Sequence, residues 1–320
     1  MSDILRAGVL CNPLSGRVKK KSQAVRAAAA NLPNSIYREA TDLSGFRTVL
    51  NEFAEAGVGL LVIIGGDGTF HAVLSHILGK QVFHVMPVIS LIPAGTTNMT
   101  AYDMRIKGKP VKLLRRLATR LQAPRSDKLL KKPVLKVEQP DTLTLHGMFF
   151  GVGIIVDGVK FFKERIQRTG VTGEGASGLV IIRYLLELLF NRSSQASYGL
   201  SLSVSEDGGE WKNGHYLVLF ASALDRLLVG IKPYWGEQAA PMHMLALNRS
   251  PRALWRALLP LLSGRGNRLQ EVDGYYSRNL DELTIQMDGD FIIDGEIYTV
   301  SRDNGPVRIT IQDTIEVLVI

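Results

Sequence analysis

The chain has 320 residues, of which 46% are hydrophobic and 21% charged, and this composition is too apolar for an intrinsically disordered protein. Its single cysteine, Cys11, excludes an internal disulfide framework and any zinc or iron–sulfur site built from several cysteines. The formal net charge of +8 is compatible with nucleic acid, anionic lipid or a phosphorylated substrate. The length favours two domains, because one hydrophobic core rarely holds this many residues.

The N-terminal residues lack the basic and apolar regions of a signal peptide. The longest stretch without Asp, Glu, Lys or Arg runs from Gln81 to Tyr102, and Pro87 and Pro93 interrupt it. Such a stretch does not form a membrane-spanning helix. We therefore expect a cytoplasmic protein that is soluble or peripheral at the inner face of the membrane.

The first third of the chain repeats a short apolar run, a polar loop and a segment of helical pattern. The apolar runs are Ala7–Cys11, Val58–Ile64 and Val88–Ile92, and the helical segments include Ser22–Ala30 and Phe46–Ala56. Apolar runs of this length are typical of buried parallel strands. The three loops after these runs are then expected at the carboxyl edge of one sheet, where ligands of α/β folds bind.

From about Pro133 the pattern changes to short alternating runs, which are typical of antiparallel strands. The predicted strands are Val134–Val137, Thr142–Phe150, Leu200–Val204, Tyr216–Ala221, Met242–Leu247, Leu283–Met287, Phe291–Ile293, Ile297–Val300 and Val307–Ile311. The segments Leu179–Asn191 and Pro251–Leu262 have a helical pattern.

The loop from Gly65 to Thr69 has the composition of a phosphate-binding loop. Its three glycines allow backbone N–H groups to surround an anion, and the following helix adds the partial positive charge of its N-terminus. Thr69 can cap that helix or donate a hydrogen bond to a phosphate oxygen. Asp67 is either a ligand of Mg²⁺ or a residue that stabilises the turn. A plain strand-to-helix turn explains the glycines equally well.

Four motifs resemble those of the diacylglycerol kinase catalytic-domain family, in its bacterial lipid-kinase form. They are Asn12–Gly16, Gly65–Thr69, Pro93–Asn98 and Ile293–Glu296, in this order and over nearly the whole chain. The resemblance implies a Rossmann-like α/β N-terminal domain of the NAD kinase and diacylglycerol kinase type, followed by a C-terminal antiparallel β-sandwich domain with inserted helices.

The resemblance also implies the domain boundaries and the reaction. Residues 1–125 would bind nucleotide, residues 126–306 would bind lipid, and a C-terminal strand of about 307–320 would return to the first domain. ATP and lipid would meet in the cleft between the domains. The γ-phosphate of ATP would pass, with Mg²⁺, to a hydroxyl of a diacylglycerol-like or sphingoid-like lipid. The expected partners are this lipid and an anionic membrane surface, without nucleic acid.

The same resemblance assigns roles to individual residues. Glu296 would be the general base that takes the proton from the lipid hydroxyl, and Asp294 would support it. Asp67 and Asp127 are the candidate metal ligands. The residues expected to bind ATP or to order its loops are Asn12, Ser15, Gly65, Gly66, Asp67, Gly68, Thr69, Gly95, Thr96, Thr97 and Asn98.

Without the family, Asp294-Gly295 between two apolar runs predicts the two-residue turn of a β-hairpin. The two interpretations are compatible, because a hairpin tip can present Glu296. Two positions depart from the family: Met99 stands where an acidic residue is common, and Gln238–Met242 lacks an Asp-Gly pair of an accessory metal site. The alternatives are therefore a soluble-metabolite kinase of the NAD kinase type and a catalytically degenerate nucleotide- or lipid-binding module.

Three further segments allow two interpretations each. Residues 105–132 contain eleven Lys or Arg residues and one acid, with leucines at helical spacing, which predicts either a helix on anionic lipid or an ordinary covering helix. Leu179–Phe190 is apolar almost all round and suits an acyl-chain pocket or a core helix. Gly151–Asp157 resembles the family's Gly-rich strand on the lipid side, where Asp157 either contacts a head group or ends the strand.

Overall fold

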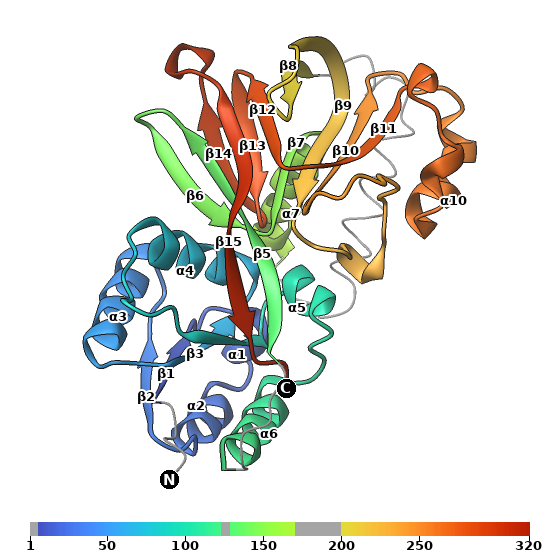
Figure 1. The fold of residues 1–320 in the computed structure, drawn as a ribbon. Coiled ribbons are helices and arrows are strands. Elements are labelled where there is room, and N and C mark those ends of the chain that lie inside the picture. Colours follow the sequence, from blue (N-terminus) through green and yellow to red (C-terminus); the bar gives the residue numbers. More distant parts are fainter. Residues whose placement is uncertain (1–5, 123–128, 170–199) are drawn as a thin grey trace. The chain divides into compact units, whose positions relative to one another are not determined.

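The computed structural model describes residues 6–122, 129–169 and 200–320, and the chain divides into two compact units (Figure 1). The first unit comprises Met1–Lys132 and Thr314–Ile320, and the second comprises Pro133–Asp313. The division between Lys132 and Pro133 coincides with the change of hydrophobic pattern along the sequence. None of the described helices is both long enough and apolar enough to cross a membrane.

The first unit is an α/β domain built on a parallel sheet. Its strands are β1 (Ala7–Cys11), β2 (Ser35–Glu39), β3 (Leu60–Gly65) and β4 (Val88–Pro93), in the spatial order β2-β1-β3-β4. Neighbouring strands are parallel, with Cys11 opposite Ile64 and Gly65 opposite Pro93. The carboxyl ends of β1, β3 and β4 therefore lie at one edge of the sheet, as the three apolar runs predict.

One or two helices follow each of β1, β3 and β4, and one helix follows β2. They are α1 (Gly16–Lys19), α2 (Ser22–Ala30), α3 (Leu43–Glu55), α4 (Asp67–Gly79), α5 (Met99–Asp103) and α6 (Pro110–Gln122). The helix predicted from Phe46 begins three residues earlier, because Asp42 caps it: its carboxylate accepts a hydrogen bond from Gly45 N at 2.9 Å.

The basic helix α6 packs against α2 and β4. Leu113, Leu114 and Leu117 are fully buried, whereas Lys112 and Arg115 are exposed. The leucines are therefore taken up by the core of the first unit, which is the covering-helix interpretation of this segment. They are not available for insertion into lipid.

The second unit is mostly antiparallel, and the predicted fold class is confirmed. Its strands are β5 (Leu130–Gln139), β6 (Leu143–Gly147), β7 (Phe149–Gly153), β8 (Leu200–Glu206), β9 (Lys212–Ser222), β10 (Met242–Asn248), β11 (Tyr275–Leu280), β12 (Glu282–Gln286), β13 (Gly289–Ile293) and β14 (Glu296–Val300). The main path is β14-β13-β7-β9-β8-β12, β10 pairs with β9 and β11, and β5 pairs with β6. The described helices are α7 (Ile154–Thr169) and α10 (Leu254–Ser263).

The last strand, β15 (Val307–Val317), contributes to both units. Its first residues pair with β12 in antiparallel register, and Val317 lies opposite Ile89 of β4 in parallel register. Leu318 N donates a hydrogen bond to Ile89 O at 2.8 Å, and Arg120 Nη1 donates to Val319 O at 2.8 Å. The C-terminal residues thus extend the parallel sheet of the first unit beyond β4.

The strand expected at Gly151–Asp157 is shorter than this prediction, because it stops at Gly153. Gly153 has a φ of +79°, and a Cβ there would lie 2.4 Å from Leu217 O, so the chain turns and α7 begins at Ile154. Asp157 lies in the first turn of α7, where burial raises the pKa of its carboxyl group. The helix expected at 179–191 lies outside the described residues.

Asp103 of α5 and Lys132 of β5 form a buried ion pair, with Asp103 Oδ2 2.6 Å from Lys132 Nζ. We expect Asp103→Asn to lower the free energy of unfolding by about 3–5 kcal/mol, because it leaves the lysine charge buried without its carboxylate. Denaturant unfolding measures this value. Glu52→Gln, which removes the exposed partner of Arg38, is the matched control and should cost about 1 kcal/mol or less. Equal losses in the two variants would contradict the burial argument.

Candidate functional site

The three loops at the carboxyl edge of the parallel sheet contact one another directly. Ala94 N donates a hydrogen bond to Gly65 O at 2.8 Å, and Arg17 N donates to Ala94 O at 3.0 Å. Asn12 Nδ2 donates to Thr69 Oγ1 at 3.0 Å. The Asn12–Gly16 loop therefore contacts the second motif through Asn12, and Arg17, the residue after this loop, contacts the third motif. The second and third motifs are joined to each other by the bond between Ala94 and Gly65.

Gly66 and Gly95 pack backbone against backbone at the centre of this edge. A Cβ on Gly95 would lie 2.5 Å from Gly66 Cα, and a Cβ on Gly66 would lie 2.9 Å from Gly95 Cα. A Cβ on Gly65 would lie 2.5 Å from Thr69 Cβ. No side chain fits at these positions unless the loops separate, so the glycines are required for the close approach of the loops.

Asp67 joins the second loop to the third. Its Oδ2 accepts hydrogen bonds from Thr97 Oγ1 at 2.7 Å and from Met99 N at 2.9 Å, and its Oδ1 accepts one from Thr100 N at 3.0 Å. The residue is only 8% exposed. These contacts are the ones that the turn-stabilising interpretation of Asp67 requires.

Asn98 shapes the third loop from within. It has a φ of +48° and precedes α5, its Oδ1 accepts a hydrogen bond from Gly95 N at 2.8 Å, and its Nδ2 donates to Gly95 O at 2.7 Å. Thr96, between these two residues, is half-buried. Met99, the departure from the family pattern, is buried as the first residue of α5.

The groups at this edge fit the phosphates of a nucleotide. α4 begins at Asp67, directly after the glycines, and the first N–H groups of a helix have no partner within the helix. Gly66 at the N-cap has no side chain to satisfy them, and Gly68 lies in the first turn. Together with the Ser15 and Thr69 hydroxyls, these donors suit an anion at the positive end of the helix dipole.

A metal site made by protein side chains alone is not found among the described residues, where no three His, Cys, Asp or Glu side chains cluster. Asp127 lies outside the described residues, and Asp67 uses its carboxylate to hold the third loop. Mg²⁺ is commonly bound by substrate phosphates and water with only one or two carboxylates, so the nucleotide itself would supply most of its ligands.

In the second unit, Asp294 and Gly295 form the turn of the β13–β14 hairpin. Ile293 lies opposite Glu296, and the two turn residues have φ values of +49° and +87°, so the predicted hairpin is confirmed. Asp294 is 5% exposed, its N donates to Phe149 O at 3.0 Å, and its Oδ2 accepts a hydrogen bond from Met148 N at 2.9 Å. Asp294 therefore anchors the hairpin tip and does not face solvent.

Glu296 remains accessible at the start of β14, with 47% of its side chain exposed. Lys163 Nζ of α7 donates to Glu296 Oε2 at 2.9 Å, and one turn earlier Lys160 Nζ donates to Asp290 Oδ2 at 2.6 Å. Two residues after Glu296, burial and that carboxylate raise the pKa of Tyr298 to about 12. Lys163 was not predicted, because its partner lies 133 residues further along the chain and no local motif links them.

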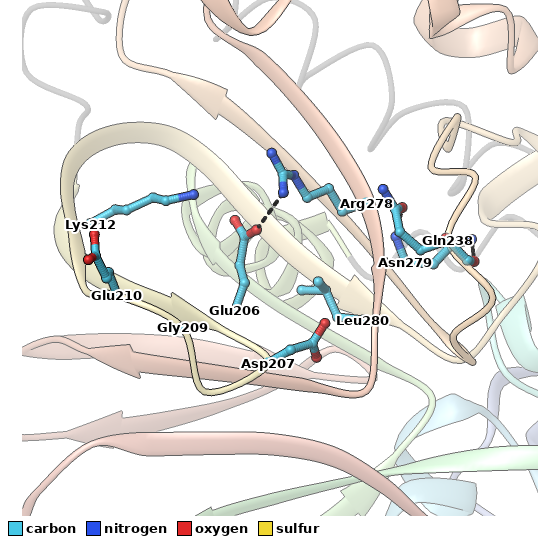
Figure 2. Close-up of a pocket in the computed structure, with 9 residues that line it drawn as sticks. All are labelled: Glu206, Asp207, Gly209, Glu210, Lys212, Gln238, Arg278, Asn279 and Leu280. Carbon is cyan, nitrogen blue, oxygen red and sulfur yellow. Dashed lines mark hydrogen bonds and ion pairs between the residues drawn. The ribbon is translucent and has the colours of Figure 1, made fainter.

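A cavity of about 210 Å³ opens elsewhere in the second unit (Figure 2). Its lining is mainly polar and charged: Glu206, Asp207, Gly209, Glu210, Lys212, Gln238, Arg278, Asn279 and Leu280. An ion pair between Arg278 and Glu206, 3.4 Å long, crosses its wall. None of the predicted site residues lines it, and this wall does not suit an acyl chain, which needs an apolar one.

His71, two residues after the Gly65–Thr69 loop, is a buried histidine rather than a surface one. It is only 2% exposed, because α4 is covered over most of its circumference and turns this side chain into the core. Its ring Nδ1 lies 3.5 Å from Ser75 Oγ on the next turn. The position of His71 in the sequence, close to a predicted ligand site, does not indicate that its side chain is buried.

Comparison with known proteins identifies similar sequences and folds. Residues 6–126 match the family model of the diacylglycerol kinase catalytic domain. A diacylglycerol kinase structure from Bacillus anthracis str. Sterne superposes with a TM-score of 0.60 and 13% identity, over 98% of this chain and 97% of that one. A second structure from this organism, provisionally named for the same activity, has a TM-score of 0.64 and 14% identity, over 98% and 96%. These identities establish similarity of fold alone, and no curated protein matches the chain.

We expect Gly95→Ala to destabilise the first unit by about 1–3 kcal/mol and to abolish nucleotide binding, because the new Cβ meets the Gly66 backbone. Denaturant unfolding and calorimetric titration with ATP measure the two effects. Gly16→Ala is the control for stability, since a Cβ there has no atom within 4 Å. Wild-type stability in Gly95→Ala would show that the loops tolerate separation.

Asp67→Asn separates the two roles considered for this carboxylate. If Asp67 orders the third loop, the variant should weaken ATP binding about tenfold with or without Mg²⁺, because one amide oxygen replaces two acceptors for Thr97, Met99 and Thr100. Titration with ATP in magnesium and in EDTA measures both affinities. A loss confined to the magnesium titration would instead assign Asp67 to the metal.

Proposed function

We propose that this chain, which belongs through residues 6–126 to the diacylglycerol kinase catalytic-domain family, is an ATP-dependent kinase that phosphorylates a lipid hydroxyl. The observation that carries the proposal is the backbone contact of Gly66 with Gly95 at the N-terminus of α4. It leaves a set of N–H donors that an anion with several oxygens can use. A plain strand-to-helix turn would not require a glycine from a second loop.

In the proposed reaction, the first unit binds the triphosphate. The α4 N-terminus and the Ser15 and Thr69 hydroxyls would donate to phosphate oxygens, while Asp67 and Asn98 hold the loops in place. Mg²⁺ bound with ATP would neutralise part of the phosphate charge. Phosphoryl transfer depends mainly on such positioning and charge stabilisation, which agrees with a site made largely of backbone donors.

The second unit would supply the acceptor side of the reaction. Glu296 is the accessible carboxylate of the C-terminal motif, and we assign it as the general base that takes the proton of the lipid hydroxyl. Lys163 would hold this carboxylate in one orientation, and Asp294 would hold the hairpin that carries it. The reaction requires that the bound γ-phosphate and Glu296 reach the same hydroxyl.

The second part of the proposal is the class of lipid that accepts the phosphate. A diacylglycerol-like or sphingoid-like lipid follows from the Asn12–Gly16 and Ile293–Glu296 motifs, which resemble those of the lipid-kinase branch. These motifs also argue against a soluble-metabolite kinase of the NAD kinase type. One observation supports the alternative of a catalytically degenerate module: Met99 stands where the family commonly has an acidic residue, and it is buried.

We expect Glu296→Gln to lower turnover by about 10²- to 10⁴-fold while ATP affinity stays within twofold, because a glutamine cannot take the proton. The assay is transfer of labelled phosphate from ATP, with Mg²⁺, to micellar diacylglycerol, monoacylglycerol, ceramide, sphingosine or a bacterial lipid extract. NAD is included as an acceptor. Glu237→Gln, at an exposed position of the same unit, is the matched control and should have wild-type turnover.

The outcomes of this assay separate the candidates. A labelled lipid in the wild type and the control, but not in Glu296→Gln, supports a lipid kinase and gives its substrate class. Labelled NAD without labelled lipid would favour a soluble-metabolite kinase. ATP binding without any labelled product would favour the degenerate module. Near-normal turnover of Glu296→Gln would overturn the assignment of the base.

A further inference from the structure

Helix α10 has apolar side chains on two opposite faces. Leu254, Ala257 and Leu261 are buried in the second unit, at the i, i+3 and i+7 spacing of one helix face. Trp255 and Leu259 are one turn apart on the other face, and they are 73% and 78% exposed. Figure 1 shows α10 outside the strands of this unit. The buried face accounts for the folding of α10, and the outer face does not contribute to the core.

A third exposed apolar side chain lies in a turn beside the N-terminal end of this helix. Val272 is 86% exposed and precedes Asp273 in a short 3₁₀ turn. Arg252 N, at the start of α10, donates a hydrogen bond to Asp273 O at 2.8 Å, and Tyr275 Oη donates to Arg252 O at 2.7 Å. The turn is therefore fixed beside the N-terminal end of the helix. We call Trp255, Leu259 and Val272 the α10 surface.

The segment that carries α10 has charges of one sign. Residues 238–270 contain no Asp or Glu, and they contain five arginines, all of them exposed: Arg249, Arg252, Arg256, Arg265 and Arg268. The acids that follow are engaged with arginines, since Glu271 pairs with Arg278 at 2.8 Å and Asp273 lies 3.8 Å from Arg252. Trp255 and Leu259 thus lie in a segment with a local excess of positive charge.

We propose that the α10 surface docks on an anionic lipid bilayer. Tryptophan and leucine on one helix face insert at the boundary between head groups and acyl chains, and tryptophan is favoured there because its ring is apolar and its N–H is polar. Arginines around them bind the lipid phosphates, with an attraction of about 1 kcal/mol for each basic residue near the surface. A second copy of the chain fits less well, because pairing this surface with itself would bring ten arginines together.

This proposal is independent of the kinase activity. It also differs from the expectation raised by the basic segment 105–132, in which Leu113, Leu114 and Leu117 of α6 are buried. Helix α6 has four basic residues and α10 has one, but of the two only α10 keeps large apolar side chains outside. A matched comparison of α10 with α6 is therefore available within one chain.

The test is co-sedimentation of the full chain, without ATP, with vesicles of equal parts phosphatidylglycerol and phosphatidylcholine and with vesicles of phosphatidylcholine alone. Neither contains a lipid kinase substrate of the proposed class, so the result does not depend on catalysis. We expect binding to the anionic vesicles that weakens as salt is raised. Trp255→Ser/Leu259→Ser should lower the partition coefficient about tenfold or more, and Arg256→Gln should lower it about fivefold.

Two control variants match these changes. Val85→Ser/Trp211→Ser removes other exposed apolar side chains, and Arg115→Gln/Arg116→Gln removes exposed charges from α6. Both should bind the anionic vesicles within twofold of wild type. Equal loss in a control and in the α10 variants would overturn the proposal, as would the absence of wild-type binding or equal binding to both kinds of vesicle.

Tryptophan fluorescence independently measures how deeply the α10 surface inserts into the bilayer. Lipids brominated on their acyl chains should quench the tryptophan emission of wild type and of Trp211→Phe, but much less that of Trp255→Phe, which keeps an apolar ring. Unchanged quenching in Trp255→Phe would place another tryptophan in the bilayer and overturn the proposal. A dimer in sedimentation that Trp255→Ser/Leu259→Ser converts to a monomer would instead identify a second copy as the occupant.

Discussion

The arrangement of the three loops at the carboxyl edge of the parallel sheet depends on the contact of the Gly66 and Gly95 backbones. Two parallel strands bring these glycines to neighbouring positions at one edge of the sheet, and the lack of side chains lets the loops touch. This contact places the hydrogen bonds of Asp67 within reach of the third loop and leaves the first turn of α4 open to an anion. A wider separation would remove both features, because a hydrogen bond weakens steeply beyond its normal length.

Two of the carboxylates in the family motifs accept hydrogen bonds from backbone N–H groups. Asp67 accepts N–H groups of the third loop, and Asp294 accepts Met148 N beside its own hairpin. Both are nearly buried, whereas Glu296 in the same C-terminal motif is half exposed and paired with Lys163. Burial thus divides the acidic residues into those that set the positions of loops and one that is accessible to a substrate. This division is consistent with phosphoryl transfer, where accurate positioning supplies much of the rate.

The two amphipathic helices show how packing changes the meaning of a sequence pattern. Both α6 and α10 are rich in leucine, α6 with four basic residues and α10 with one and further arginines in the flanking segments, and both resemble helices that lie on membranes. In α6, Leu113, Leu114 and Leu117 complete the core of the first unit, and the exposed side chains are charged or polar. In α10 one set of apolar residues completes the core of the second unit, and Trp255 and Leu259 remain outside. Which helix can insert into lipid follows from these neighbours.

The local sequence pattern by itself determined those strands, loops and turns that depend only on residues adjacent in the chain. The buried strands β1, β3 and β4, the loops after them and the Asp294-Gly295 hairpin are all predictable, because apolar runs and turn residues act locally. The edge strand β2 was not predicted, since none of its residues is fully buried and it needs no apolar run. The turn-stabilising role of Asp67, the pairing of Lys163 with Glu296 and the exposure of Trp255 were decided by the tertiary structure alone. Each depends on residues distant in sequence or on the packing of a whole helix, and one-dimensional spacing carries no information about either.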